Sequence, residues 1–112
     1  MTEKSEKYLS DILRAIDLIE SFTIDIVDFN SYENDLKTQS AVERQLGIIG
    51  EALNKLKKSE ESVEITNSKH IIAFRNRLVH AYDSIDNSIV WVILKRHLSK
   101  LKDEIKNLDT RK

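Results

Sequence analysis

Residues 41–56 read AVERQLGIIGEALNKL and carry the clearest indication of the fold. Their apolar side chains alternate spacings of four and three residues, at Val42, Leu46, Ile49, Leu53 and Leu56. Such a seam is typical of a helix packed in a bundle. Gly47 and Gly50 lie in the middle of this helix, where each costs roughly 1 kcal/mol relative to alanine. We therefore expect another helix to pack closely against the two glycines.

The segments before this stretch extend the same pattern. In residues 9–22 apolar side chains recur every three or four positions, which predicts an amphipathic helix with Ser5 as its N-cap. Residues 23–35 (TIDIVDFNSYEND) interrupt the period, and we expect an ordered connection there with a short helical turn. The central helix itself should run from about Asp35 to Lys58.

Two more helices are predicted downstream. After an acidic loop at residues 59–64, a third helix should run from near Ser68 to about Tyr82. Asp86 is the expected cap of a fourth helix, whose seam reads Leu94, Leu98, Leu101, Ile105 and Leu108. The predicted fold is all-α. We expect a single domain over residues 1–112, an up-and-down bundle of four main helices with a short extra helical turn after the first.

Composition narrows the possible functions. The 112 residues include no cysteine, no proline and two glycines, and 33% of them are charged. Without cysteine there is neither a disulfide nor thiolate chemistry, and a zinc site is disfavoured. The first ten residues, MTEKSEKYLS, are polar, and no apolar run approaches the length of a membrane span. We therefore expect no signal peptide, no membrane association and a cytoplasmic location.

The net charge of −1 conceals an asymmetry. Residues 1–66 carry 8 Lys and Arg against 14 Asp and Glu, while residues 67–112 carry 10 against 5. Opposite charges on the two halves can pair within the fold, which is the interpretation we favour. They can also give a nearly neutral protein a local basic face for a polyanion.

Hydrogen-bonding and titratable side chains concentrate in residues 75–82, RNRLVHAY. On an α-helix each residue turns by about 100°, so Asn76 and His80 share a face and can touch. Arg75 and His80 lie about 140° apart around the same helix axis. We infer that either the chain bends near His80 or a second copy of the protein completes the site.

These residue types suit metal-free RNA cleavage. Histidine can move protons near neutral pH, and arginine can stabilise charge that develops on phosphorus. Asn76 can hold the imidazole of His80, while Arg77 and Lys69 are either solvated charges or contacts to RNA phosphates. A two-fold symmetric homodimer would bring two Arg75–His80 sets together as base and acid. RNA cleavage at such a site would leave a 2′,3′-cyclic phosphate on the RNA.

Structural roles remain possible for several of these groups. A histidine near the end of a helix, such as His80, is often only solvated or capping. His70 and His97 have no partner in sequence and are expected to be structural, with a three-histidine metal site as the less favoured alternative. Glu51 is expected to form an ion pair on its own helix, although it can also reach the motif. We therefore predict no metal site.

The sequence resembles the HepT-like (DUF86) branch of the HEPN superfamily. Residues 75–82 fit the R-x4-H-x-Y pattern of that superfamily, and residues 75–86 (RNRLVHAYDSID) resemble the motif helix and the loop after it. Residues 41–56 resemble the second core helix of the branch, and residues 90–105 (VWVILKRHLSKLKDEI) its last helix. The similarity spans nearly the whole chain and is weakest over residues 1–30 and 59–70.

The resemblance implies a homodimeric ribonuclease toxin of a toxin–antitoxin pair, with Arg75 and His80 as the catalytic residues and Asn76 in support. It also implies that Tyr82 is the tyrosine adenylylated by an MntA-like minimal nucleotidyltransferase antitoxin. ATP and magnesium would belong to that partner, so no cofactor is expected in this chain. The RNA substrate, transfer RNA or messenger RNA, is left open. Two alternatives are a non-catalytic helical module that docks a nucleotidyltransferase and a structural bundle whose motif is incidental.

Overall fold

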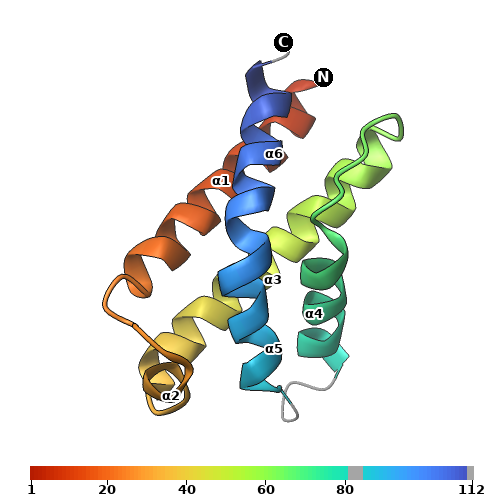
Figure 1. The fold of residues 1–112 in the computed structure, drawn as a ribbon. Helices are drawn as coiled ribbons and strands as arrows, with labels where there is room; N and C mark the ends of the chain where they lie inside the picture. The colour runs from red at the N-terminus through yellow and green to blue at the C-terminus, as the bar shows by residue number, and fades with distance from the viewer. Residues whose placement is uncertain (81–84, 111–112) are drawn as a thin grey trace.

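The computed structural model describes residues 1–80 and 85–110, with the backbone alone for residues 109 and 110. Its described part is all-α, as predicted. The elements in chain order are α1 (Glu3–Phe22), α2 (Phe29–Glu33), α3 (Leu36–Ser59), α4 (Lys69–His80), α5 (Asn87–Val92), the π-helical turn η2 (Ile93–His97) and α6 (Leu98–Thr110). The last three follow one another without a break and form one long C-terminal helix (Figure 1).

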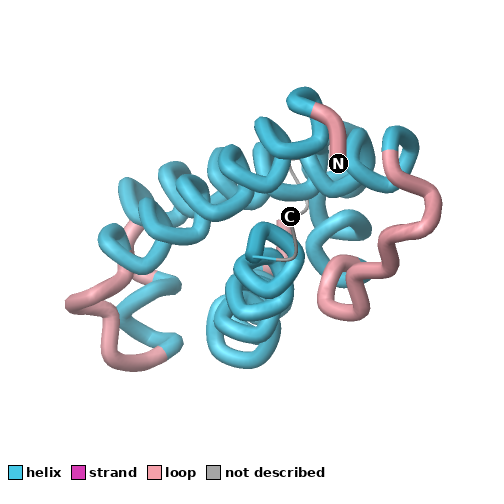
Figure 2. The backbone as a smooth tube through the Cα atoms, turned by 90° about the horizontal axis from the view of Figure 1, so that it is seen from above, coloured by secondary structure: helices cyan, strands magenta, loops and turns pink. Residues whose placement is uncertain are grey.

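The four long helices run up and down and enclose one core. α1 packs against α3 and α6, α3 also packs against α4, and α4 contacts η2, which closes the bundle. Seen from above, the C-terminal helix is viewed nearly end-on and lies on one side of the layer formed by α1 and α3 (Figure 2). The predicted extra turn after the first helix is α2. No described helix combines the length and the apolar character needed to cross a membrane.

The apolar seam of α3 lies at the centre of the core. Its five predicted positions are each at most 2% exposed: Val42, Leu46, Ile49, Leu53 and Leu56. Tyr32 of α2 is also fully buried and lies beside Trp91, with ring centroids 5.9 Å apart. Ile24, in the connection before α2, is by contrast 79% exposed. The connection therefore contributes to the core mainly through α2.

Asp86 caps α5, as predicted, and Asp35, where the central helix was expected to begin, is the N-cap of α3. The carboxylate of Asp35 accepts a hydrogen bond from the backbone N–H of Thr38 at 3.0 Å, and that of Asp86 accepts from Ser88 at 2.9 Å. Each bond satisfies a backbone donor that the first helical turn leaves without a partner.

The prediction that Ser5 caps the first helix is wrong. Thr2 is the N-cap and accepts from the backbone N–H of Ser5 at 3.1 Å. The buried hydroxyl of Ser5 instead donates to Glu60 Oε1 at 2.9 Å and lies 2.9 Å from the hydroxyl of Ser59. Ser5 therefore fastens the start of α1 to the end of α3.

The C-terminal helix contains a turn that the seam did not predict. Ile93 is 1% exposed, whereas the predicted seam position Leu94 is only partly buried. Five positions separate Ile93 from the next buried residue, Leu98, and in an α-helix such a step would rotate the side chain by about 140° out of line. A π turn closes hydrogen bonds between residues five apart, so η2 keeps both side chains in the core.

Candidate active site

The motif helix α4 is fixed at its start by the loop before it. Ser68 is 7% exposed, and its hydroxyl donates to the carbonyl oxygen of Ile65 at 2.7 Å. The carboxylate of Glu104 on α6 accepts from the backbone N–H groups of Thr66 at 2.6 Å and Asn67 at 3.0 Å. These two residues lie just ahead of Ser68 and the start of α4. The helix therefore has a defined position relative to α6.

Along its length α4 lies close to α3, as the two glycines predicted. A Cβ atom on Gly50 would overlap Cβ of Arg75 and would stand 3.2 Å from the carbonyl oxygen of Ile71. A Cβ on Gly47 would stand 3.2 Å from a terminal methyl of Leu78. Gly50 thus lets the aliphatic part of Arg75 lie directly on α3, and it positions this arginine.

Arg75 and His80 lie on different sides of α4. Arg75 is half-buried beside α3, and its guanidinium makes a long hydrogen bond of 3.4 Å to the side-chain oxygen of Asn76. His80 is the last residue of α4 and is exposed, as is Asn76. The predicted contact between Asn76 and His80 is not among the hydrogen bonds of the described residues. A single chain therefore does not bring Arg75 and His80 together within α4.

The other predicted site residues occupy separate places. Lys69 is exposed in the first turn of α4, about 16 Å along the axis from His80 at ~1.5 Å per residue. Arg77 is exposed near the start of α5. The pKa of Asp86 there is lowered, chiefly by hydrogen bonds from Ser88 and also by the positive charge of Arg77. Tyr82 lies outside the described residues.

Glu51 forms the ion pair expected on its own helix. Its carboxylate lies 3.4 Å from the ammonium of Lys55, one turn further along α3, and both side chains are about half exposed. The described residues contain no group of three or more histidine, aspartate or glutamate side chains arranged to hold a metal ion.

A contact between two histidines was not predicted. The rings of His70 on α4 and His97 in η2 are stacked, with centroids 4.2 Å apart and planes inclined by 17°. The pKa of His97 is lowered by partial burial and by the positive charge of its neighbours His70, Lys100 and Arg96. No local pattern joins residues 27 positions apart.

The bundle, with Arg75 and His80 five positions apart on its third long helix, has the architecture of a HEPN-like domain. The chain belongs to the Ribonuclease HepT-like family, which matches residues 12–108. A Thermococcus cleftensis protein named "Probable ribonuclease HepT" is 36% identical, over 96% of this chain and 98% of its own length. A Methanocaldococcus jannaschii protein whose name designates it a candidate RNase is 35% identical, over 88% and 90%. No solved structure gives a significant match.

Proposed function

We propose that the protein is a metal-independent endoribonuclease that cleaves RNA at a site shared by two copies of the chain. Family membership supports the ribonuclease activity. The shared site rests on one geometric observation: Arg75 lies against α3 while His80 is exposed across the same helix. Two chains related by a two-fold axis can supply the groups that one chain holds apart.

In the proposed reaction one imidazole takes the proton of the RNA 2′-hydroxyl, and the 2′-oxygen forms a bond to phosphorus. The bond from phosphorus to the 5′-oxygen breaks, and an imidazolium supplies the proton to the leaving oxygen. Arg75 stabilises the charge on the phosphoryl oxygens. The products are a 2′,3′-cyclic phosphate and a 5′-hydroxyl, and the reaction consumes no co-reactant.

The first test incubates the purified protein with total RNA in excess EDTA and compares wild type with His80→Ala and Arg75→Gln. An intact-mass measurement first establishes that Tyr82 carries no modification. Wild type should leave cyclic-phosphate ends. His80→Ala should be slower by about 10²–10⁴-fold, the typical contribution of a catalytic proton donor or acceptor, and Arg75→Gln by about 10²–10³-fold, the typical contribution of a group that stabilises developing charge. No cleavage by unmodified, dimeric protein would favour the docking module instead.

The shared site has a test of its own. If both copies of His80 are needed, a dimer of one wild-type chain and one His80→Ala chain is inactive. After subunit exchange at equal amounts, only a quarter of the dimers are then fully wild type, so the activity per wild-type chain should fall by half. A site complete within one chain would leave that activity unchanged.

We also propose that the protein is a cytoplasmic toxin silenced by an MntA-like nucleotidyltransferase. The oxygen of Tyr82 would attack the α-phosphorus of ATP and release pyrophosphate and a proton. The added negative charge and bulk would stand close to the site that RNA phosphate must enter. Incubation with the partner, ATP and magnesium should add the mass of one or more AMP groups to wild type and abolish cleavage. Tyr82→Phe should keep its mass and its activity.

A further inference from the structure

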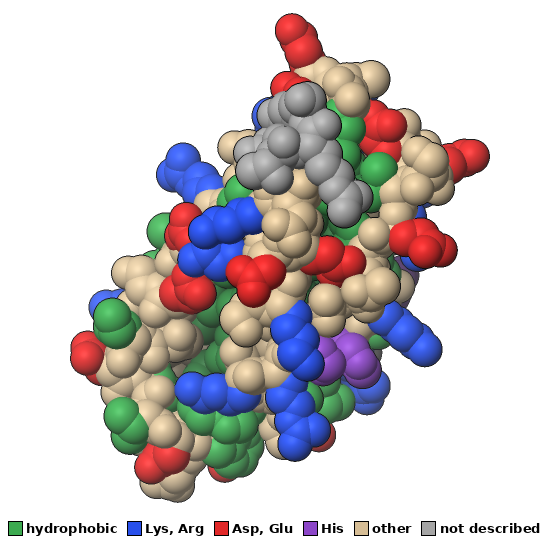
Figure 3. Space-filling view, turned by 45° about the horizontal axis from the view of Figure 1, so that its top comes forward, with side chains coloured by type: hydrophobic (Ala, Val, Ile, Leu, Met, Phe, Trp, Pro, Cys, Tyr) green, Lys and Arg blue, Asp and Glu red, His purple; other side chains and the backbone are tan. Residues whose placement is uncertain are grey.

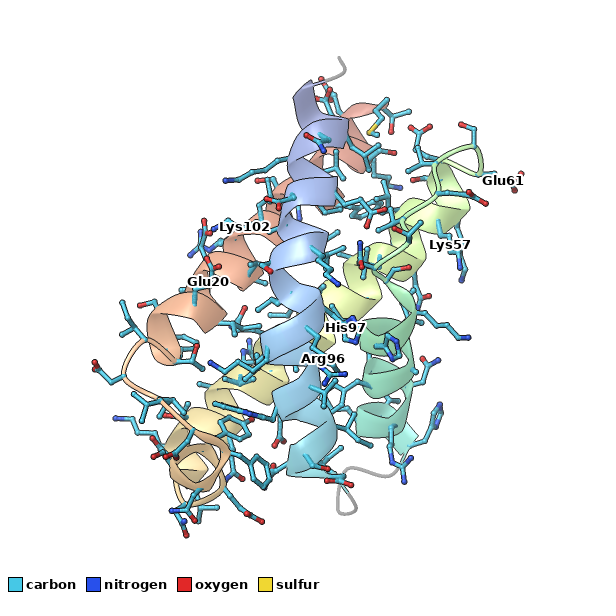
Figure 4. All side chains as sticks on the ribbon, viewed as in Figure 1. Glu20, Lys57, Glu61, Arg96, His97 and Lys102 are labelled. Carbon is cyan, nitrogen blue, oxygen red and sulfur yellow. The ribbon has the colours of Figure 1, made fainter. Side chains whose placement is uncertain are left out.

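The stacked histidines belong to a surface built jointly by α4 and the C-terminal helix. η2 is wider than an α-helical turn, and it brings His97 against His70 on α4. Arg96 and Lys100 are exposed and close enough to His97 to influence its pKa. Arg96 and His97 lie on the side of the C-terminal helix that faces α4 (Figure 4). Together with Arg77, we call these residues the histidine patch: His70, Arg77, Arg96, His97 and Lys100.

The histidine patch carries the positive charges of Arg77, Arg96 and Lys100, and Asp86 lies close enough to Arg77 for their charges to interact. The ion pairs among the described residues use Lys7, Lys55 and Lys102, and none of them involves an arginine or lysine of the patch. Glu104, a neighbouring carboxylate on α6, is occupied by four hydrogen bonds from Thr66 and Asn67. Histidine side chains bordered by lysine and arginine are visible on this face in Figure 3. Such a surface complements a polyanion.

The patch is also aligned with the proposed catalytic histidine. His70, Ala73, Arg77 and His80 follow one another at spacings of three, four and three residues, so they lie within about 80° of one another around α4. The side chain of Ala73, between His70 and Arg77, is small and exposed. His70 and His80 are about 15 Å apart along the axis at ~1.5 Å per residue. A single RNA strand of a few nucleotides can therefore contact both His70 and His80.

We propose that the histidine patch binds the sugar-phosphate backbone of an RNA strand that continues along α4 to the phosphate at His80. Arg96, Lys100 and Arg77 pair with phosphate oxygens, and the exposed ring edges of His70 and His97 donate hydrogen bonds to the same strand. This role rests on the proposed ribonuclease function, because RNA is the polyanion that such an enzyme must hold. A nearly neutral protein thereby obtains a local site for its substrate.

Binding can be measured without cleavage. We would use a fluorescent single-stranded oligoribonucleotide that is 2′-O-methylated throughout, because it lacks the nucleophile of the proposed reaction. Its anisotropy is titrated with dimeric wild type and with Arg96→Gln/Lys100→Gln in EDTA over a series of salt concentrations. We expect the double variant to bind about tenfold more weakly. Its salt slope should fall by about 1.4, which corresponds to two phosphate contacts at ~0.7 each.

A second variant, His70→Gln/His97→Gln, tests the rings apart from the permanent charges and should weaken binding several-fold. The matched control is Lys4→Gln, which removes an exposed charge near the N-terminus and should stay within about twofold of wild type. All these side chains are exposed or partly exposed, and circular dichroism verifies that each variant folds. Unchanged RNA affinity and salt slope in the Arg96/Lys100 variant would overturn the proposal. Inorganic phosphate that binds the patch as tightly as the oligoribonucleotide, at the same concentration of phosphate groups, would also overturn the proposal and indicate a small-anion site.

A cleavage assay run alongside separates this proposal from the one on which it rests. Wild type that cuts RNA while the patch variants bind RNA normally would refute the patch and leave the ribonuclease intact. Patch-dependent binding by a protein that cuts no RNA would support the RNA surface and refute the enzyme. Loss of nucleotidyltransferase binding alone in the patch variants would assign the surface to the partner protein and overturn the proposal.

Discussion

Gly47 and Gly50 occupy neighbouring turns of α3, but they differ in what a methyl group would meet. At Gly50 the methyl would overlap Cβ of Arg75, which is tied to the backbone of α4 and cannot rotate away. At Gly47 it would meet the end of the Leu78 side chain at 3.2 Å, which can turn aside. Replacing each glycine in turn by alanine therefore tests whether the close packing of α3 against α4 depends on Gly50 alone.

We expect Gly50→Ala to lower the free energy of unfolding by about 1–3 kcal/mol, the usual cost of overpacking. Gly47→Ala should be neutral or stabilising by up to about 1 kcal/mol, because alanine is the better helix former. Urea unfolding of both variants gives the comparison. Gly50→Ala should also slow RNA cleavage, since it displaces Arg75. Equal stability of the two variants would show that the helices are not in close contact at Gly50 in solution.

At the scale of single residues, the sequence predicted interactions whose partners are local. Asp35 and Asp86 each precede a helix and accept from a backbone donor two or three residues ahead, so their roles could be read from position alone. Ser5 has the same chemistry, but its hydroxyl is bound by residues 59 and 60, more than fifty positions away. A local pattern contains no information about such a partner.

At the scale of elements, the amphipathic helices were predictable and the π turn was not. A regular period of 3.6 residues selects Leu94, four positions before Leu98, over Ile93, five positions before it. The structure buries Ile93 instead, because the wider turn of η2 accommodates one additional residue. That additional residue also brings His97 to His70, a contact that periodicity could not suggest.

If η2 contains one inserted residue, deleting a residue there should leave the core in register. Deletion of Arg96 shortens the step from Ile93 to Leu98 to four positions, which an α-helix satisfies. We expect the free energy of unfolding to change by less than about 1 kcal/mol, since π hydrogen bonding is seldom favoured over α. Circular dichroism and urea unfolding measure both helicity and stability.

The control for this deletion removes Lys100, an exposed residue of α6 outside η2. Every later residue of α6 then turns by about 100°, which carries Leu101 and Ile105 out of the core. We expect this variant to lose more than about 4 kcal/mol and to be largely unfolded. If the Arg96 deletion destabilised the protein as much as the Lys100 deletion, η2 would not contain an inserted residue.

At the scale of the molecule, the two charge-unbalanced halves pair only in part. Lys102 on α6 lies 3.1 Å from Asp17 and 2.7 Å from Glu20 on α1, so one contact of the expected kind joins the halves (Figure 4). The cations of the histidine patch take no part in such pairs among the described residues. The bundle itself followed from four amphipathic segments with short connections. The placement of His70 beside His97 required the folded arrangement of two separate helices.

Glu104 connects α6 to the residues that precede α4. The two carboxylate oxygens of Glu104 receive the backbone N–H groups of Thr66 and Asn67, the Thr66 hydroxyl at 2.9 Å and the Asn67 side-chain amide at 2.9 Å. Partial burial tends to raise the pKa of this carboxyl, but these hydrogen bonds outweigh it and the pKa is lowered. The charge also lies near the N-terminus of α4, where the helix dipole favours an anion.

Glu104→Gln should therefore loosen the joint between the last helix and the motif helix. The amide N–H₂ of the glutamine would face hydrogen-bond donors and leave at least one of them without an acceptor. We expect the free energy of unfolding to fall by about 1 kcal/mol at pH 7. The loss is modest because the site is mostly solvated. Since folding lowers the pKa of Glu104, its contribution is complete above the unfolded value of about 4.3 and disappears as the pH falls through the folded value. The difference between wild type and Glu104→Gln in the free energy of unfolding, measured in urea, should shrink accordingly below about pH 4.

The control is Asp103→Asn, which removes the same charge from the adjacent exposed residue. It should cost less than about 0.5 kcal/mol at any pH. Faster amide exchange at the start of α4 in Glu104→Gln alone would locate the effect at this joint, whereas equal losses in both variants would reduce it to net charge.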